Sequence, residues 1–249
     1  MLVSVASRKA PLRRTSGWIS RLTILGLSLL PATAIAQSCR IPDRLEPAVA
    51  TRPDKEAPRI VPVRAYSLAL SWSPQYCRSR PDDGQCDRAN GQFRFILHGL
   101  WPEGVGKDYP QWCAASPAPL PEAIVRAQFC TTPSPRLIAH EWAKHGTCAT
   151  TNPADYFAVG RKLFASIRTP DMNALSRRRI DVGGFKRLMS AANPQIMPSA
   201  MVVSTDRNGG WLREVRVCLT KAMVAAPCPR DQSRGAPDGA PLRIWRGER

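Results

Sequence analysis

The chain has 249 residues, of which 43% are hydrophobic and 22% are charged, so its composition is that of a globular protein with enough residues for one core. Its formal net charge of +17 implies a polyanionic partner, but charge alone does not separate a nucleic-acid substrate from a nucleic-acid ligand or an anionic lipid surface. None of its eight cysteines has C-x-x-C spacing, which argues against a zinc ribbon and a thioredoxin-type site.

Residues 1–36 have the layout of a secretory signal peptide. Basic residues without any acidic residue precede an apolar run at 22–30, and small residues ending at Ala36 form a cleavage site that leaves Gln37 as the mature N-terminus. An uncleaved membrane anchor is the alternative, but the run is too short to span a bilayer and Pro31 follows it directly. We therefore expect export to the periplasm or the cell exterior, with no stable membrane anchor and with the cysteines paired as disulfides.

Two strands are predicted after a proline-rich, extended N-terminal arm at residues 37–63. Apolar and small residues alternate from Tyr66 to Trp72, which is typical of a half-buried strand. The run from Phe93 to His98 alternates in the same way, so His98 is expected on the opposite face from its packed neighbours.

Helices are predicted between these strands and a later hairpin. Ser134 and Pro135 mark the start of a helix over 136–145, and Asn152-Pro153 begins a second one.

Residues 201–205 and 211–219 read as two strands of a hairpin, whereas residues 229–249 are rich in proline, glycine and arginine and are predicted to be a disordered basic tail. The expected fold is a single disulfide-stabilised α+β domain at residues 64–228, with a central antiparallel sheet packed with helices.

All three histidines lie in two short segments. His98 is in one, and the other holds His140, Glu141, Lys144 and His145, which share one polar face if the segment is a regular helix. A solvated charged face would explain the second segment by itself. A zinc site is a further alternative, but its signature has histidines four residues apart, and here they are five apart with a lysine between them.

The residue types suit cleavage of RNA without a metal ion. Such cleavage needs a base that deprotonates the 2′-hydroxyl, an acid that protonates the leaving oxygen and a cation near the phosphorane. Imidazoles titrate near neutrality and suit the first two tasks, and a lysine suits the third.

The segments His98-Gly-Leu-Trp-Pro102 and His140-Glu-Trp-Ala-Lys-His-Gly-Thr-Cys148 resemble the two active-site motifs of the ribonuclease T-two family, the exported acid endoribonucleases. Further similarity runs through Leu68–Cys77 and Leu212–Cys218, so the resemblance covers about residues 64–228. It implies a metal-independent endoribonuclease without a cofactor. Single-stranded RNA would be cleaved, with weak base preference, to 2′,3′-cyclic phosphates and then 3′-phosphates.

The resemblance also implies a role for each residue of the two segments. His145 would be the general base, His98 the general acid, and His140 a phosphate ligand. Glu141 and Lys144 would stabilise the phosphorane. Two further residues would contact a base: Trp101, whose ring either stacks on it or belongs to the core, and Glu103.

The disulfide pairs implied by the resemblance are Cys77–Cys130, Cys113–Cys148 and Cys218–Cys228, which leaves Cys39 to pair with Cys86. We expect a monomer that needs no protein partner. A non-catalytic cationic binder of RNA or lipid is the main rival, since it would need only the charge and would have no use for the three histidines.

Overall fold

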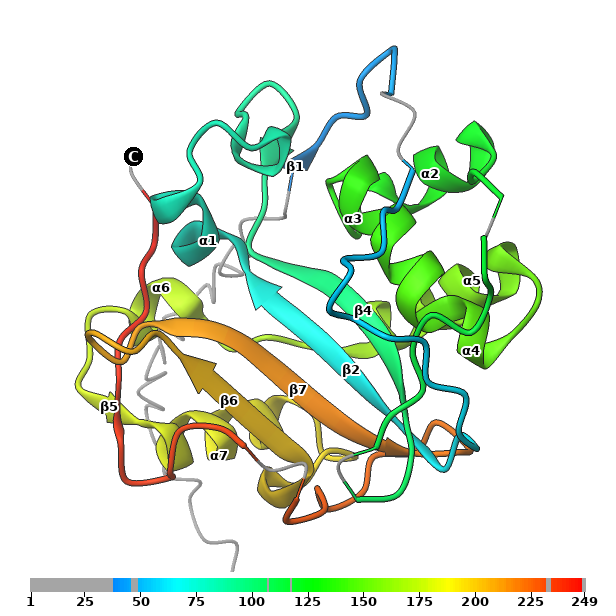
Figure 1. The fold of residues 1–249 in the computed structure, drawn as a ribbon. Coiled ribbons are helices and arrows are strands. Elements are labelled where there is room, and N and C mark those ends of the chain that lie inside the picture. Colours follow the sequence, from blue (N-terminus) through cyan, green and yellow to red (C-terminus); the bar gives the residue numbers. More distant parts are fainter. Residues whose placement is uncertain (1–37, 46–48, 107, 117, 232–233, 248–249) are drawn as a thin grey trace, which may run out of the picture. The chain divides into compact units, whose positions relative to one another are not determined.

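The computed structural model describes residues 38–45, 49–106, 108–116, 118–231 and 234–247, all within one compact unit (Figure 1). The predicted signal peptide, residues 1–36, lies outside these ranges. None of the helices within them has the length and apolar character needed to span a bilayer.

A four-stranded antiparallel sheet forms the centre of the fold, which confirms the predicted α+β class. Its strands follow the order β4-β2-β7-β6. They are β2 (Ala65–Trp72), β4 (Phe95–Glu103), β6 (Met201–Thr205) and β7 (Leu212–Thr220). Two small antiparallel sheets join β1 (Ser38–Cys39) to β3 (Gly91–Gln92) and β5 (Ile180–Asp181) to β8 (Pro241–Leu242).

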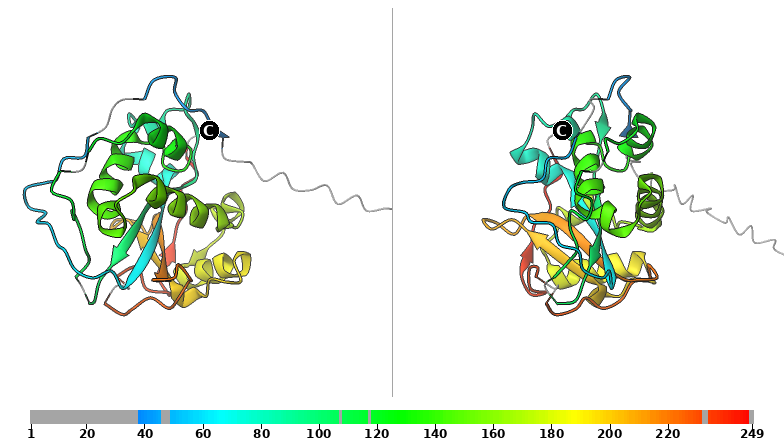
Figure 2. Two further views of the ribbon diagram at one scale, coloured as in Figure 1. Left: turned by 90° about the vertical axis from the view of Figure 1, so that its right-hand side faces the viewer. Right: turned by 45° about the vertical axis from the view of Figure 1, so that its right-hand side comes forward.

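Helices α2–α5 gather beside β4, and α6 and α7 lie with β6 and β7 (Figures 1 and 2). The helices are α1 (Ser73–Ser79), α2 (Glu122–Phe129), α3 (Pro135–Glu141), α4 (Thr147–Ala149), α5 (Pro153–Ser166), α6 (Met172–Leu175) and α7 (Val182–Ala192). Short turns of other helix types are η1 (Gly84–Cys86), η2 (Trp142–Gly146) and η3 (Pro198–Ala200). Leu68, Leu70 and Val215 alternate along β2 and β7 and are fully buried, so one face of the sheet forms the core beneath these helices.

Two bulges interrupt the alternation of the sheet. In β4, Gly99 pairs with Ala69 and Leu97 pairs with Leu70, so His98 is an extra residue without a partner on β2. Strict alternation would put Leu100 on the same face as His98. Because of the bulge, Leu97 and Leu100 both pack in the core while His98 lies on the other face.

Arg213 is the extra residue of the second bulge. On β7, Glu214 pairs with Ser204 and Leu212 pairs with Thr205. Leu212 is fully buried, whereas Arg213 is exposed.

The disulfides correct part of the expected pairing. Cys113–Cys148 and Cys218–Cys228 are the implied pairs. The expected pairs Cys77–Cys130 and Cys39–Cys86 were wrong, because the structure joins Cys77 to Cys86 and Cys39 to Cys130. Cys77 and Cys86 lie on two consecutive short helical segments, and pairing of β1 with β3 holds the N-terminal arm where Cys39 meets the end of α2.

The prediction of a disordered tail was wrong for residues 234–247. Leu242 pairs with Ile180 in the β5–β8 sheet, and Leu242 and Ile244 are 3% and 5% exposed. The backbone oxygen of Trp245 accepts a hydrogen bond from Trp72. Composition suggested disorder, but two apolar residues at period two are enough to anchor the segment to the core.

Candidate active site

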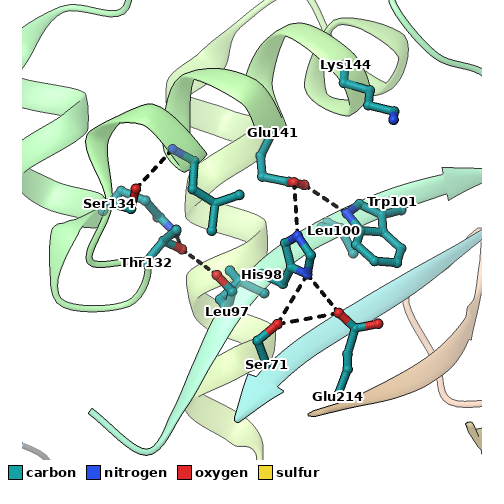
Figure 3. Close-up of polar contacts among 12 residues, drawn as sticks. Ser71, Leu97, His98, Leu100, Trp101, Thr132, Ser134, Glu141, Lys144 and Glu214 are labelled. Atoms are coloured by element: carbon teal, nitrogen blue, oxygen red, sulfur yellow. Dashed lines mark hydrogen bonds and ion pairs between the residues drawn. The ribbon is translucent and has the colours of Figure 1, made fainter. Parts of the chain in front are cut away.

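Figure 3 shows that His98 and Trp101 of β4 face Glu141 at the junction of α3 and η2. The ring of His98 lies 5.1 Å from that of Trp101, which in turn lies 5.5 Å from the ring of His145. The indole nitrogen of Trp101 donates a 2.8 Å hydrogen bond to Glu141 Oε2, and His98 Nε2 is 3.7 Å from Glu141 Oε1.

The helix that carries four of these residues is regular only in its first half. The Ser134 side chain accepts a hydrogen bond from the Leu137 N–H, and this cap starts α3 as predicted. The chain is helical throughout the predicted range 136–145, but it widens from regular α geometry into the π-helical turn η2 from Trp142 onwards. Such π-turns are frequent at functional sites, and this one holds Lys144 and His145.

His98 lies between two carboxylates. Its Nδ1 is 2.7 Å from Glu214 Oε2 and 3.2 Å from Ser71 Oγ. Burial lowers the pKa of His98, but the hydrogen bond that His98 donates to Glu214 and the charges of Glu141 and Glu214 outweigh burial, so the pKa lies above its ordinary value. The protonated form of His98 is therefore favoured.

His145 is in the opposite situation. His145 is 7% exposed, and its Nδ1 is buried without a hydrogen-bond partner in the described chain. Burial, and then the positive charges of Lys144, His140 and His98, hold its pKa well below the ordinary value. The neutral imidazole is therefore favoured at His145.

The other two ionisable residues of the helix are also perturbed. Glu141 is 3% exposed, and its burial raises its pKa to about 7, against the opposing effects of His98, Trp101 and Lys144. Burial and the charge of Lys144 lower the pKa of His140. A carboxyl group that holds its proton up to neutral pH can donate a hydrogen bond to an anion.

Glycines in the two motifs make room for these contacts. A Cβ at Gly99 would overlap Glu141 Oε2 and lie 2.5 Å from Trp101 Nε1. A Cβ at Gly146 would overlap the ring of Trp142. Each glycine is thus required by a close approach of side chains and not by an unusual backbone angle.

Glu214 and Ser71 were missed by the sequence analysis. They pair across β7 and β2, and the Ser71 hydroxyl donates a 3.4 Å hydrogen bond to Glu214. Burial raises the pKa of Glu214, but the hydrogen bond and charge of His98 lower it below its ordinary value. The available signal was an acidic residue within a predicted strand, directly before the buried Val215.

Glu56 of the N-terminal arm was also missed. Its carboxylate is 2.7 Å from Lys144 Nζ and accepts a 2.9 Å hydrogen bond from the indole of Trp112. The hydrogen bond from Lys144 lowers the pKa of Glu56. Trp112 has a left-handed backbone angle (φ 54°) and meets the ring of His140 edge to face. The N-terminal arm therefore places the Glu56 carboxylate against Lys144, the residue that the resemblance implies would stabilise the phosphorane.

The two expected base-binding residues differ in position. Trp101 is partly exposed and is held between His98 and His145. Glu103 is 8% exposed and accepts a 2.6 Å hydrogen bond from Ser67, and burial raises its pKa. Glu103 does not line the cleft that opens beside His98 and His140.

A cleft of about 1030 Å³ opens beside His98 and His140. Its walls include Ser71 and Glu214, and arm residues 49–51 line it as well. Within the described residues, no group of three or more His, Cys, Asp or Glu side chains is placed to hold a metal ion. The ionisable side chains that line the cleft include the imidazoles of His98 and His140 and the carboxylate of Glu214.

Comparison with known proteins gives consistent matches. Residues 63–228 match the model of the ribonuclease T2 family. A probable ribonuclease of Haemophilus influenzae is 32% identical over 181 residues, which are 67% of this chain and 61% of that protein. A ribonuclease of Aeromonas hydrophila is 33% identical over 163 residues, or 63% of this chain and 71% of that protein.

The chain therefore spans about three fifths of the Haemophilus protein's length. Among solved structures, trichomaglin, described as an S-like ribonuclease, superposes with a TM-score of 0.58 at 21% identity, over 73% of this chain and 97% of trichomaglin.

Proposed function

Because the chain belongs to the ribonuclease T2 family, we propose that it is an exported, monomeric endoribonuclease that cleaves single-stranded RNA without a metal ion or other cofactor. The relatives of Haemophilus and Aeromonas carry the name ribonuclease, which supports RNA as the substrate. Four disulfides support an oxidising compartment.

The observation that carries the proposal is the opposite perturbation of two histidines that flank Trp101. Burial keeps His145 neutral, and the hydrogen bond to the Glu214 carboxylate, with the charge of that carboxylate, keeps His98 protonated. Titratable groups whose pKa values are pushed apart in this way suit a base and an acid that work at the same pH.

The reaction that follows is a transphosphorylation. His145 takes the proton of the 2′-hydroxyl, the 2′-oxygen forms a bond to phosphorus, and the bond from phosphorus to the 5′-oxygen breaks as His98 gives that oxygen a proton. The product is a 2′,3′-cyclic phosphate. In the second step water attacks this phosphate as His98 takes its proton, and the bond from phosphorus to the 2′-oxygen breaks as His145 gives that oxygen a proton, which leaves the 3′-phosphate.

Three residues act on the charge of the phosphate. Lys144 supplies a cation for the phosphorane, and Glu141, which holds a proton up to about pH 7, donates a hydrogen bond to a non-bridging oxygen. His140 lines the cleft and binds the phosphate. Glu214 acts through His98 as a positioning residue, because its 2.7 Å contact fixes the Nδ1 proton and leaves Nε2 toward the reaction.

The first test uses the mature chain, RNA and excess chelator. We expect cleavage of RNA to fragments with cyclic phosphate ends and no cleavage of DNA or of RNA with 2′-O-methyl groups, since both lack the nucleophile. Rapid cleavage of either one would refute transphosphorylation. Binding without any cleavage would favour the non-catalytic cationic binder.

The second test compares alanine variants of the three histidines on one dinucleoside monophosphate. His98→Ala and His145→Ala should lower kcat by about 10²- to 10⁴-fold with little change in KM. His140→Ala should raise KM proportionately more, because the phosphate contact is present in the ground state too. If His98→Ala keeps wild-type kcat, the assignment of the general acid is wrong.

A further inference from the structure

The cleft extends well past the catalytic histidines. From His98 it continues along Ser71 and Glu214 to the turn between β6 and β7, where Arg207 and Arg213 line it. Cleavage of a dinucleoside monophosphate involves one phosphate, so the arginine end of the cleft has no use for so short a substrate.

The bulge of β7 directs Arg213 into this cleft. Val215 and Val217 point to the core, so regular alternation would put residue 213 on the core face as well. The bulge lets Leu212 occupy the core position and leaves Arg213 beside Glu214 on the cleft face. His98, the other bulged residue of the sheet, lines the same cleft, and bulges that redirect a side chain are common next to active sites.

Both guanidinium groups are available for a ligand. Within the described chain, neither Arg207 nor Arg213 has a hydrogen-bond or ion-pair partner. The nearby carboxylates are engaged: Glu214 contacts His98, and Asp206 Oδ1 accepts a 2.9 Å hydrogen bond from the Trp211 N–H. An arginine presents donors that match two phosphate oxygens at once.

The position of His98 gives the direction of the strand. His98, the proposed acid for the leaving 5′-oxygen, lines the cleft, whereas the proposed base His145 is not among its lining residues. The cleft beyond His98 therefore follows the leaving side of the scissile bond.

We propose that Arg213, assisted by Arg207, forms a phosphate-binding subsite for the nucleotides on the 3′ side of the scissile bond, so that the preferred substrate is an RNA strand several nucleotides long. This inference rests on the proposed ribonuclease activity.

The experiment compares three substrates that each contain a single cleavable ribose, all other riboses being 2′-O-methylated. One is a dinucleoside monophosphate, one adds three nucleotides on the 3′ side, and one adds three on the 5′ side. Arg213→Ala should lower kcat/KM by about tenfold on the 3′-extended substrate and by less than about twofold on the other two. The slope of log(kcat/KM) against log[salt] on the 3′-extended substrate should become shallower by about 0.7, the value for one phosphate contact with a single strand.

Two further variants complete the design. Arg187→Ala removes the same charge from an exposed position on α7, beneath the opposite face of the sheet, and should change none of the three rates. Arg213→Lys keeps the charge and should restore part of the rate on the 3′-extended substrate only.

Equal losses on all three substrates, or no loss on any, would overturn the subsite. If the wild-type chain cleaves none of them, the proposed function fails, and the salt dependence of binding a fully 2′-O-methylated strand then tests Arg213 by itself.

Discussion

Gly99→Ala places one methyl group at the most crowded point of the candidate active site. The new Cβ would overlap Glu141 Oε2 and lie 2.7 Å from Glu141 Cδ, so the carboxyl group must move and its hydrogen bond from Trp101 must break. Overpacking costs about 1–3 kcal/mol, and leaving a buried polar group without its hydrogen-bond partner costs about 1–3 kcal/mol. The reduced entropy of the unfolded chain offsets about 0.4–1 kcal/mol of this.

The variant should therefore lose about 2–5 kcal/mol of unfolding free energy, which corresponds to a fall in Tm of roughly 4–20 °C for a domain of this size. Its kcat should fall by about 10²-fold, since Glu141 no longer meets the phosphorane. Thermal melts and steady-state kinetics on a dinucleoside monophosphate measure both effects. Gly239→Ala is the matched control, because a Cβ there meets nothing within 4 Å. Wild-type Tm and kcat in Gly99→Ala would refute the reasoning from packing.

The remaining predictions concern charge. The profile of kcat against pH should fall on the acid side as His145 gains a proton at its lowered pKa. It should fall on the alkaline side as Glu141, whose pKa is about 7, and His98, whose pKa is raised, lose their protons. Glu214→Gln removes part of what raises the pKa of His98, so the alkaline limb should move to lower pH while the acid limb stays in place; an unmoved alkaline limb would mean that Glu214 only supports the fold. Glu56→Gln should lower the KM for RNA by up to about fivefold, because it removes the anion that competes with phosphate for Lys144. The effect is limited because the Glu56–Lys144 ion pair is partly exposed. A higher KM in titrations of this variant would show that Glu56 positions the lysine instead.

Much of the site can be predicted from residues that are close together in the sequence. The spacing of His140, Glu141, Lys144 and His145 places them on one helical segment whatever the rest of the fold does. The Ser134 cap is equally local, because it depends on a hydrogen bond that spans three residues.

Alternation likewise predicted the strands of the sheet, but it could not predict the bulges at His98 and Arg213. A bulge depends on how two strands pair, and the partner strand is remote in the sequence. The tail was misjudged for a related reason, since burial of Leu242 and Ile244 requires a core formed by other segments.

The sequence by itself determined which chemical groups the site contains, because a few short motifs carry them. Only the tertiary structure decided how those groups ionise and which distant residues join them. Glu214 lies 116 positions from His98, and Cys39 lies 91 positions from Cys130. Desolvation and charge pairing depend on distances in space, and these distances are not set by separation along the chain. The opposite perturbation of His98 and His145 therefore exists only in the folded protein.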